Sequence, residues 1–194
     1  MRIILASSSP RRQQLMEQAG IPCEIIVSDV DENIEGNARE QVEQLALRKA
    51  QAVRPQISGK AIIIAADTLV SLDGQVLSKP TCGADAYAML QALQGRKHTV
   101  YTGVTLIKIS GTGDEIHSFV DTADVYFRPL SCYDIGGYIA TGESTDKAGA
   151  YGAQGRGAVL VERIEGDFFT VMGLPLSRLC AMLTELGVDI WRQG

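Results

Sequence analysis

The chain has 194 residues and a formal net charge of −5, with 45% hydrophobic and 21% charged residues. This composition is close to the average of soluble globular proteins and excludes a disordered chain. The sequence contains no block of Lys and Arg, so a surface that follows the phosphates of a nucleic acid is not expected, whereas a small basic pocket is compatible with the charge. A chain of this length can bury a proper core, and we expect one domain over residues 1–194.

The apolar runs of the sequence are short. Ala61–Ala66 and Ala158–Val161 are far below the ~20 residues that a membrane-spanning helix needs. The amino-terminal residues form no apolar core of a signal peptide. We therefore expect a cytoplasmic protein that does not contact a membrane. Its four cysteines are scattered without a Cys-x-x-Cys pair, which favours reduced thiols over a zinc site.

The first half of the sequence alternates between strand and helix patterns. Three serines followed by Pro10 supply the hydroxyl cap and the first-turn proline of a helix that ends at Gly20. Apolar residues recur at helical spacing between Asn37 and Val53, with charged residues on the other face. We expect strands at Arg2–Ala6, Cys23–Val27 and Ala61–Ala66, an acidic loop at Asp29–Gly36, and helices after Ser7–Pro10, over Asn37–Val53 and over Gly83–Leu93.

The run Ala61–Ala66 is apolar throughout, which indicates a strand that is buried on both faces. Asp67 follows directly and is expected at the end of this strand, where open α/β sheets place ligand-binding residues. Asp73-Gly74 lies between two short β-type runs and predicts a tight hairpin, with Lys79 just beyond it. Taken alone, Asp67 is explained equally well as a turn cap, and Lys79 as a turn lysine.

The second half of the sequence is richer in strand residues. His98–Ile109 and Ile116–Phe127 contain many Val, Thr, Ile and Tyr residues and predict antiparallel strands joined by the polar turn 110–114. The polar, Gly-rich stretch Thr141–Gly157 is too long for a simple connection and is typical of a functional loop, with a flexible loop as the alternative. We further expect a capped helix at Ser131–Ala140, a strand at Ala158–Ile164, a turn at Gly166-Asp167 and a final helix over Pro175–Gly187.

Hydroxyl, backbone N–H and guanidinium groups gather at the start of the first helix, in Ser7–Arg12. Such a place attracts anions, although a capped helix with solvated arginines is the simpler interpretation of the spacing. The sequence has no Gly-x-x-x-x-Gly-Lys-Ser/Thr loop, which excludes a P-loop protein. It has no Gly-x-Ser-x-Gly motif and only two histidines, so a Ser-His-Asp hydrolase is not expected. Asp31, Glu32 and Lys49 would ordinarily be solvated surface charges.

Eight segments follow one another in a specific order and spacing over nearly the whole chain: Leu5–Arg12, Asp31-Glu32, Lys49-Ala50, Ala66–Thr68, Lys79-Pro80, Tyr101–Val104, Asp146–Gly155 and Val171–Pro175. None is decisive alone, but together they resemble the Maf family of nucleotide pyrophosphatases. The resemblance implies a single Maf-like domain with a Maf/ITPase-like α/β fold. This fold has a mixed central β-sheet flanked by helices and two lobes around a cleft.

The resemblance also implies roles for individual residues. Asp67 matches the proton acceptor of the family. A triphosphate carries about four negative charges, which cationic side chains must hold while charge develops on the leaving pyrophosphate. A carboxylate ~4 Å from a phosphate charge would be repelled by roughly 4 kcal/mol. Asp67 and Glu32 therefore imply a divalent cation, Mg²⁺ or Mn²⁺, between them and the substrate. Which carboxylate acts as the base and which as the metal ligand is left open. The residues that match the catalytic pocket are Ser8, Arg12, Glu32, Lys49, Asp67 and Lys79.

Three further positions distinguish branches of the family. The dTTP/UTP branch holds Arg, Thr and Gln where this chain has Arg11, Thr68 and Gln154, whereas the 7-methyl-GTP branch holds Trp, Gln and Glu. A glutamine amide complements the O4 and N3–H edge of thymine or uracil. We therefore expect hydrolysis of dTTP and UTP to the monophosphate and pyrophosphate by water attack on the α-phosphorus. The alternatives are a house-cleaning enzyme for modified pyrimidine nucleotides and a nucleotide-responsive regulator of septum formation. A homodimer is compatible with the resemblance.

Overall fold

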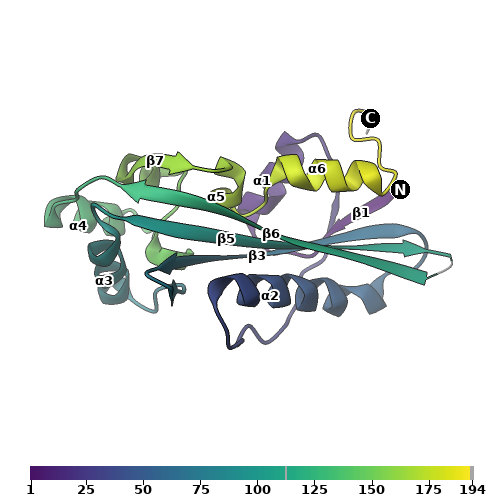
Figure 1. The fold of residues 1–194 in the computed structure, drawn as a ribbon, viewed down its shortest axis with the longest axis horizontal. Helices are drawn as coiled ribbons and strands as arrows, with labels where there is room; N and C mark the ends of the chain where they lie inside the picture. The colour runs from purple at the N-terminus through teal and green to yellow at the C-terminus, as the bar shows by residue number, and fades with distance from the viewer. Residues whose placement is uncertain (112, 193–194) are drawn as a thin grey trace.

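Among the described residues, a mixed sheet of seven strands, in the order β2-β1-β3-β5-β6-β7 with β4 paired to one end of β3, forms the centre of the molecule (Figure 1). This computed structural model describes residues 1–111 and 113–192. β1 runs parallel to β2 and β3, whereas every other pairing is antiparallel. The strands are β1 (Arg2–Leu5), β2 (Glu24–Ile25), β3 (Ala61–Leu72), β4 (Gln75–Leu77), β5 (Lys97–Ser110), β6 (Gly113–Phe127) and β7 (Val161–Glu165).

Helices cover both faces of the sheet and one of its ends (Figure 1). α2 (Ala38–Val53) lies along one face, while α1 (Pro10–Gln18) and α6 (Leu176–Glu185) lie on the opposite face. α3 (Gly83–Leu93) and α4 (Cys132–Ala140) pack at the end remote from both termini. The shorter helical segments are η1 (Arg54–Gln56), η2 (Ala148–Ala150), η3 (Gly155–Leu160) and α5 (Phe168–Met172).

Three buried apolar clusters hold these layers together. Ile62 and Ile64 of β3 point into the cluster under α1 and α6, and Ile63 points into the cluster on the α2 face. All three are 0% exposed, as the unbroken apolar run predicts for a strand covered on both sides. Val70, near the other end of β3, belongs to a third cluster with residues of α3 and α4. The two halves of β3 therefore belong to two lobes, and Asp67 lies where the lobes meet.

One edge of β3 is interrupted between the lobes. On this edge β1 pairs with residues 61–64, and β4 pairs with residues 70–72. In the described part of the chain, residues 66–69 pair with no strand on this edge. On the other edge β5 pairs with β3 continuously from Ala61 to Ser71. The gap therefore opens onto the middle of a long strand.

This arrangement corrects the expected position of Asp67. The sequence predicted a strand that ends at Ala66, but β3 continues through Asp67 to Leu72, because β5 supplies a partner from Ala61 to Ser71 and β4 pairs with Leu72. The hairpin that follows is confirmed, since Leu72 pairs with Gln75. Its two turn residues have φ values of 51° and 83°, the left-handed backbone that an Asp-Gly turn provides.

Other differences concern short elements. The strand expected at Cys23–Val27 covers only Glu24–Ile25, and the strand expected from Ala158 begins at Val161, because η3 takes up residues 155–160. Asp167, predicted in a turn, accepts a hydrogen bond from the Phe169 N–H at 2.8 Å and caps α5, which the sequence did not predict. Thr112 of the predicted turn 110–114 lies outside the described residues. The expected helices Asn37–Val53, Gly83–Leu93 and Ser131–Ala140 and the long hairpin of β5 and β6 are confirmed.

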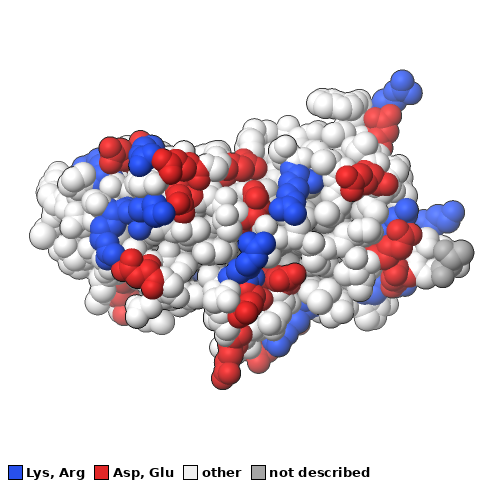
Figure 2. Space-filling view, in the orientation of Figure 1, with Lys and Arg blue, Asp and Glu red and all other residues white. Residues whose placement is uncertain are grey.

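Acidic and basic side chains are interspersed on the face shown in Figure 2, with wide neutral areas between them. All four cysteines are free thiols. In the part of the chain that the structure describes, the helices are too short or too polar to cross a membrane.

Candidate active site

A cleft of about 740 Å³ opens at the interrupted edge of β3. Its walls come from the segment after β1, the loop before α2, α2 itself, the middle of β3, the segment after β4 and the loop after α4. Gln154 is not among the lining residues, although its neighbours Gly152 and Ala153 are. The other residues expected in the site all line this cleft: Ser8, Arg11, Arg12, Glu32, Lys49, Asp67, Thr68 and Lys79.

Lys49 joins the two carboxylates of the cleft. Its Nζ lies 2.7 Å from Asp67 Oδ1 and 2.7 Å from Glu32 Oε1. The side chains of Lys49 and Asp67 are each 12% exposed, whereas that of Glu32 is 56% exposed. Asp67 lies on the face of β3 that α2 covers, and Glu32 belongs to the loop that precedes α2. The ammonium group is therefore shared between a fixed carboxylate and one at the mouth of the cleft.

Gly103 allows α2 to lie directly on the sheet at this level. It pairs with Asp67 across β5 and β3, and a Cβ atom at position 103 would lie 2.3 Å from the carbonyl oxygen of Val42. No side chain fits such an approach, so only glycine is accommodated. Lys49 follows Val42 by about two helical turns and reaches Asp67 along the same face of α2.

Three acceptors hold the guanidinium group of Arg12. Its Nε donates to Gly173 O at 2.8 Å, Nη2 to Thr68 Oγ1 at 3.0 Å and Nη1 to Ser7 Oγ at 3.3 Å. These bonds leave one N–H on each terminal nitrogen. Burial lowers the pKa of Arg12 from its ordinary value, while the charge of Asp67 acts in the opposite direction. Because a guanidinium stays protonated in proteins, Arg12 presents a fixed positive charge beside Asp67.

Ser7 and Gly173 hold Arg12 but were not predicted as site residues. Ser7 is 6% exposed, and its Oγ also accepts from the Ser9 N–H at 3.2 Å. Gly173 has φ 105°, and a Cβ atom there would lie 3.1 Å from Thr68 Oγ1. The motif Val171–Pro175 could have indicated Gly173, because a glycine directly after a helix commonly adopts the left-handed conformation that ends it.

The charges in this part of the cleft favour an anion. The hydrogen bond from Lys49, with the charges of Lys49, Lys79 and Arg12, holds the pKa of Glu32 below its usual range, although desolvation acts in the opposite direction. Three cationic side chains face two carboxylates, which leaves an excess of one positive charge. A polyanion is therefore attracted here, although the cleft has acidic groups.

The loop after α4 supplies further charges to the cleft. Lys147 Nζ pairs with Asp146 Oδ1 at 2.6 Å and donates to the carbonyl oxygen of Glu143 at 2.7 Å. Arg11 Nη1 lies 3.6 Å from Asp146 Oδ2. Asp146 therefore links Arg11, at the start of α1, to this loop.

The same loop is anchored near Gln154. The carboxylate of Glu143 accepts hydrogen bonds from the backbone N–H groups of Arg156, at 3.1 Å, and Gly157, at 3.3 Å. The hydroxyl of Tyr138 accepts from the Gly152 N–H at 3.1 Å. Gln154 lies between these anchored residues, so its backbone is held next to the cleft.

The cleft has oxygen ligands for a divalent cation, but not a complete set. Within the described ranges, no three His, Cys, Asp or Glu side chains converge as a metal cluster. Glu32 and Asp67 both face one cationic position, which Lys49 Nζ occupies. Mg²⁺ usually binds through one or two carboxylates together with waters and substrate phosphates. These residues therefore fit a cation that is shared between the protein and a phosphorylated ligand.

The sequence matches the family model described as Maf-like protein over residues 2–186. A relative from Symbiobacterium thermophilum, named dTTP/UTP pyrophosphatase, is 49% identical over 195 residues, covering 100% of this chain and 98% of the relative. Proteins of the same name from Caldanaerobacter subterraneus subsp. tengcongensis and Bacillus cereus are 45% and 44% identical, each over 97% of this chain and over 91% and 97% of their own lengths. Among solved structures, the Ham1 protein of Staphylococcus aureus is similar with a TM-score of 0.45 and 16% identity, over 66% of this chain and 72% of that one.

Proposed function

The chain belongs to the Maf family, and on this premise we propose that it is a nucleoside triphosphate pyrophosphatase that hydrolyses dTTP and UTP to the monophosphate and pyrophosphate. The observation that carries the proposal is the convergence of Arg12, Lys49 and Lys79 with Asp67 in one cleft. The names of full-length relatives support the choice of substrates. We propose that residues 1–194 form one domain of this family.

Arg12 and Lys79 are proposed to bind the phosphate chain. The acceptors around Arg12 leave one N–H on each terminal nitrogen, a geometry that suits two oxygens of one phosphate group. Lys79 approaches from the segment after β4, on the other side of the gap in the sheet. Cations fixed on both sides of the gap would stabilise the charge that develops on the leaving pyrophosphate.

Asp67 is proposed to take the proton of the attacking water. Its carboxylate reaches the cleft from the middle of β3, and the ion pair with Lys49 fixes its orientation. The water oxygen forms a bond to the α-phosphorus as the bond from that phosphorus to the α–β bridging oxygen breaks. The electron pair of the broken bond leaves with the pyrophosphate.

Glu32 and Asp67 are proposed to hold Mg²⁺ or Mn²⁺ together with phosphate oxygens. When bound, such a cation neutralises phosphate charge and polarises the phosphorus–oxygen bonds. Glu32 is suited to this role because its side chain is 56% exposed at the mouth of the cleft. Its lowered pKa keeps it ionised at neutral pH, as a metal ligand must be.

Arg11, Thr68 and Gln154 are proposed to select the base. Arg11 and Thr68 line the cleft, and Gln154 lies on the anchored loop beside it. Gln154→Glu keeps the size of the side chain but replaces the amide donor by a carboxylate. We expect this variant to lose about tenfold or more in kcat/KM for dTTP, with no loss for 7-methyl-GTP. If the ratio of kcat/KM for dTTP to kcat/KM for 7-methyl-GTP is the same in the variant and the wild type, Gln154 does not select the base.

We also propose a cytoplasmic enzyme that acts on a small molecule without nucleic acid. The free cysteines suit a reducing compartment, and the interspersed surface charges in Figure 2 offer no broad basic patch on that face.

The test of the proposed function is to incubate the protein with dTTP, UTP, CTP or 7-methyl-GTP in the presence of Mg²⁺ and to separate the products. We expect monophosphate and pyrophosphate, formed fastest from dTTP and UTP. Diphosphate with orthophosphate would mean that the γ-phosphorus is attacked, which contradicts the proposal. Faster turnover of 7-methyl-GTP would contradict the substrate assignment.

A further inference from the structure

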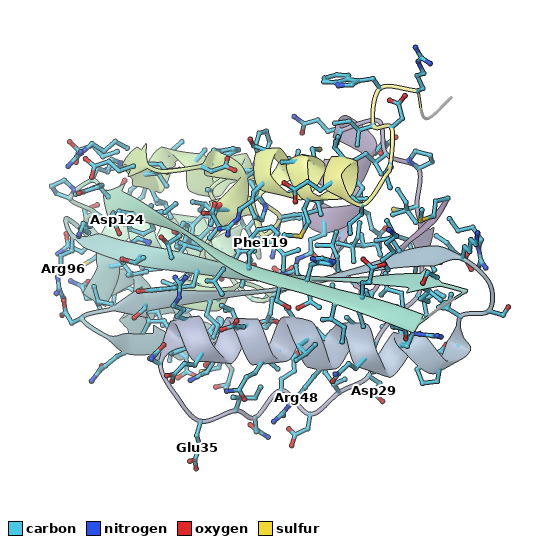
Figure 3. The ribbon with its side chains drawn as sticks, turned by 45° about the vertical axis from the view of Figure 1, so that its right-hand side comes forward. Asp29, Glu35, Arg48, Arg96, Phe119 and Asp124 are labelled. Carbon is cyan, nitrogen blue, oxygen red and sulfur yellow. The ribbon has the colours of Figure 1, made fainter. Side chains whose placement is uncertain are left out.

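A row of polar side chains crosses the sheet beside Arg12. Thr68 of β3, Thr102 of β5 and Asp121 of β6 lie opposite one another in register. Thr102 is 0% exposed and does not line the cleft. The neighbouring rows on the same face are apolar, with Ala66, Val104 and Phe119 (Figure 3) in one cluster and Val70 and Val100 in another. The polar row therefore separates two apolar clusters at the level of the cleft.

The hydrogen bonds of this row have a fixed direction. Thr102 Oγ1 donates to the carbonyl oxygen of Thr170 at 2.7 Å, since a carbonyl only accepts. A hydroxyl has one proton, so Thr102 Oγ1 must accept from Thr68 Oγ1, which lies at 3.0 Å. Thr68 Oγ1 in turn accepts from Arg12 Nη2 at 3.0 Å. Thr102 thus sets the direction in which the hydroxyl of Thr68 points.

Thr102 also supports a second acceptor of Arg12. Thr170 belongs to α5, and its carbonyl oxygen accepts both from Thr102 and from the Gly173 N–H, the latter at 3.1 Å. Gly173 follows α5 directly and offers its own carbonyl oxygen to Arg12 Nε at 2.8 Å. Thr170 Oγ1 donates to Asp121 Oδ2 at 2.6 Å, which ties α5 to β6.

We propose that Thr102 is a positioning residue for Arg12. Its hydroxyl orients Thr68 and holds α5, and these two elements fix the guanidinium so that its remaining N–H groups face the phosphates. The inference rests on the proposed pyrophosphatase function. Valine has the shape of threonine and would match the flanking apolar clusters, so the sheet itself does not require a hydroxyl at this position.

The experiment compares Thr102→Val, which removes the hydroxyl, with Thr102→Ser, which keeps it. Thr105→Val is the matched control, because Thr105 is also 0% exposed on β5 and its Oγ1 lies 2.8 Å from Ser118 Oγ, away from the cleft. We expect Thr102→Val to lose about tenfold to a hundredfold in kcat/KM for dTTP. Thr102→Ser should stay within about threefold of the wild type and Thr105→Val within about twofold, since misplacement of Arg12 is the cause of the loss.

A double-mutant cycle separates positioning from a general loss of stability. If Thr102 acts through Thr68, the fold-decrease in kcat/KM for the double variant Thr68→Val/Thr102→Val is smaller than the product of the fold-decreases for the two single variants. Multiplicative losses, or a Thr102→Ser protein as impaired as Thr102→Val, would overturn the inference. If Thr102→Val does not fold, Thr102→Ala takes its place in both comparisons.

Binding of inorganic pyrophosphate, measured by calorimetry, tests the inference apart from turnover. Thr102→Val should bind pyrophosphate about tenfold more weakly than the wild type, and Thr105→Val should bind it equally well, because Arg12 holds phosphate oxygens. Equal pyrophosphate affinity in Thr102→Val and the wild type would contradict the inference even if dTTP is hydrolysed. A wild type that binds pyrophosphate but does not hydrolyse dTTP would contradict the proposed function alone.

Discussion

Lys49 of α2 and Asp67 of β3 form an ion pair of 2.7 Å, with each side chain 12% exposed, at the level where residues 66–69 of β3 pair with no described strand on one edge. The pair forms because Gly103 lets α2 approach the sheet. A second carboxylate, Glu32, shares the same ammonium group. The ion pair therefore connects the packing of α2 to the chemistry of the cleft.

Asp67→Asn removes the group that is proposed to accept a proton and keeps its size. We expect kcat for dTTP to fall by a factor of about 10² to 10⁴ at saturating Mg²⁺, because an amide cannot act as a general base. Asp73→Asn is the control, since Asp73 lies in the turn after the same strand, its side chain is 70% exposed, and asparagine tolerates its φ of 51°. A folded Asp67→Asn protein with wild-type turnover would rule out this role.

Lys49→Met removes the shared ammonium group and leaves two carboxylates facing each other. We expect the free energy of unfolding to fall by about 1–3 kcal/mol, less than for a fully buried pair because the cleft is open to water. Arg39→Met is the control, since Arg39 is an exposed cation on the same helix, whereas Arg48 donates to the Asp31 carbonyl oxygen next to Glu32. Urea unfolding of both variants measures the difference. Equal stability of the two would show that the ion pair does not contribute.

Gly103→Ala places a methyl group where the Val42 carbonyl oxygen lies 2.3 Å away. We expect α2 to be displaced, with a loss of about 1–3 kcal/mol in the free energy of unfolding, as for overpacked cores. Activity should fall as well, because α2 carries Lys49. Gly137→Ala in α4, where nothing lies within 4 Å of the new atom, should be neutral or stabilising. A Gly103→Ala protein as stable and active as Gly137→Ala would contradict the close packing.

Much of the site could be predicted from the sequence because its charged residues occur in motifs with a fixed order. Arg12, Lys49, Asp67 and Lys79 line one cleft, as the resemblance implies. The unbroken apolar run also predicted correctly that β3 is buried on both faces. The continuation of β3 through Asp67 could not be predicted locally, because it depends on pairing with β5, a strand distant in sequence.

The supporting residues could not be predicted for a similar reason. Ser7, Thr102 and Gly173 carry no charge. Thr102 and Gly173 act through contacts with residues far away in the sequence, whereas Ser7 contacts Arg12 five residues on and lies in a serine run that a helix cap already explains. Gly103 is an unusual residue within a strand, but the reason for it becomes visible only when α2 is placed against it. Gln154 shows the converse case, since the motif predicted it in the site, whereas the lining of the cleft includes only its neighbours.

Stability should depend on the protonation of His98. His98 is 2% exposed, its Nε2 lies 2.8 Å from the hydroxyl of Tyr151, and burial lowers its pKa to about 4. The unfolded chain takes up this proton near pH 6.5, whereas the folded protein takes it up only near pH 4. Neutral His98 therefore contributes fully to the free energy of unfolding above about pH 6.5. This contribution is lost as the pH falls toward 4, and the loss at pH 5 is about 2 kcal/mol.

Urea unfolding at pH 7.5 and pH 5 tests this dependence. We expect His98→Gln to lose less stability between the two pH values than the wild type does. His117→Gln is the control, because the side chain of His117 is 40% exposed on the surface of β6. It should retain the dependence of the wild type. The same dependence in all three proteins would assign the acid sensitivity to other groups.

The most direct test of the proposed mechanism is hydrolysis of dTTP in water labelled with oxygen-18, followed by mass spectrometry of both products. The account predicts one labelled oxygen in the monophosphate and none in the pyrophosphate, because the water held by Asp67 attacks the α-phosphorus. Label in the pyrophosphate would place the attack at the β-phosphorus and contradict the arrangement of Asp67, Arg12 and Lys79 proposed for this cleft.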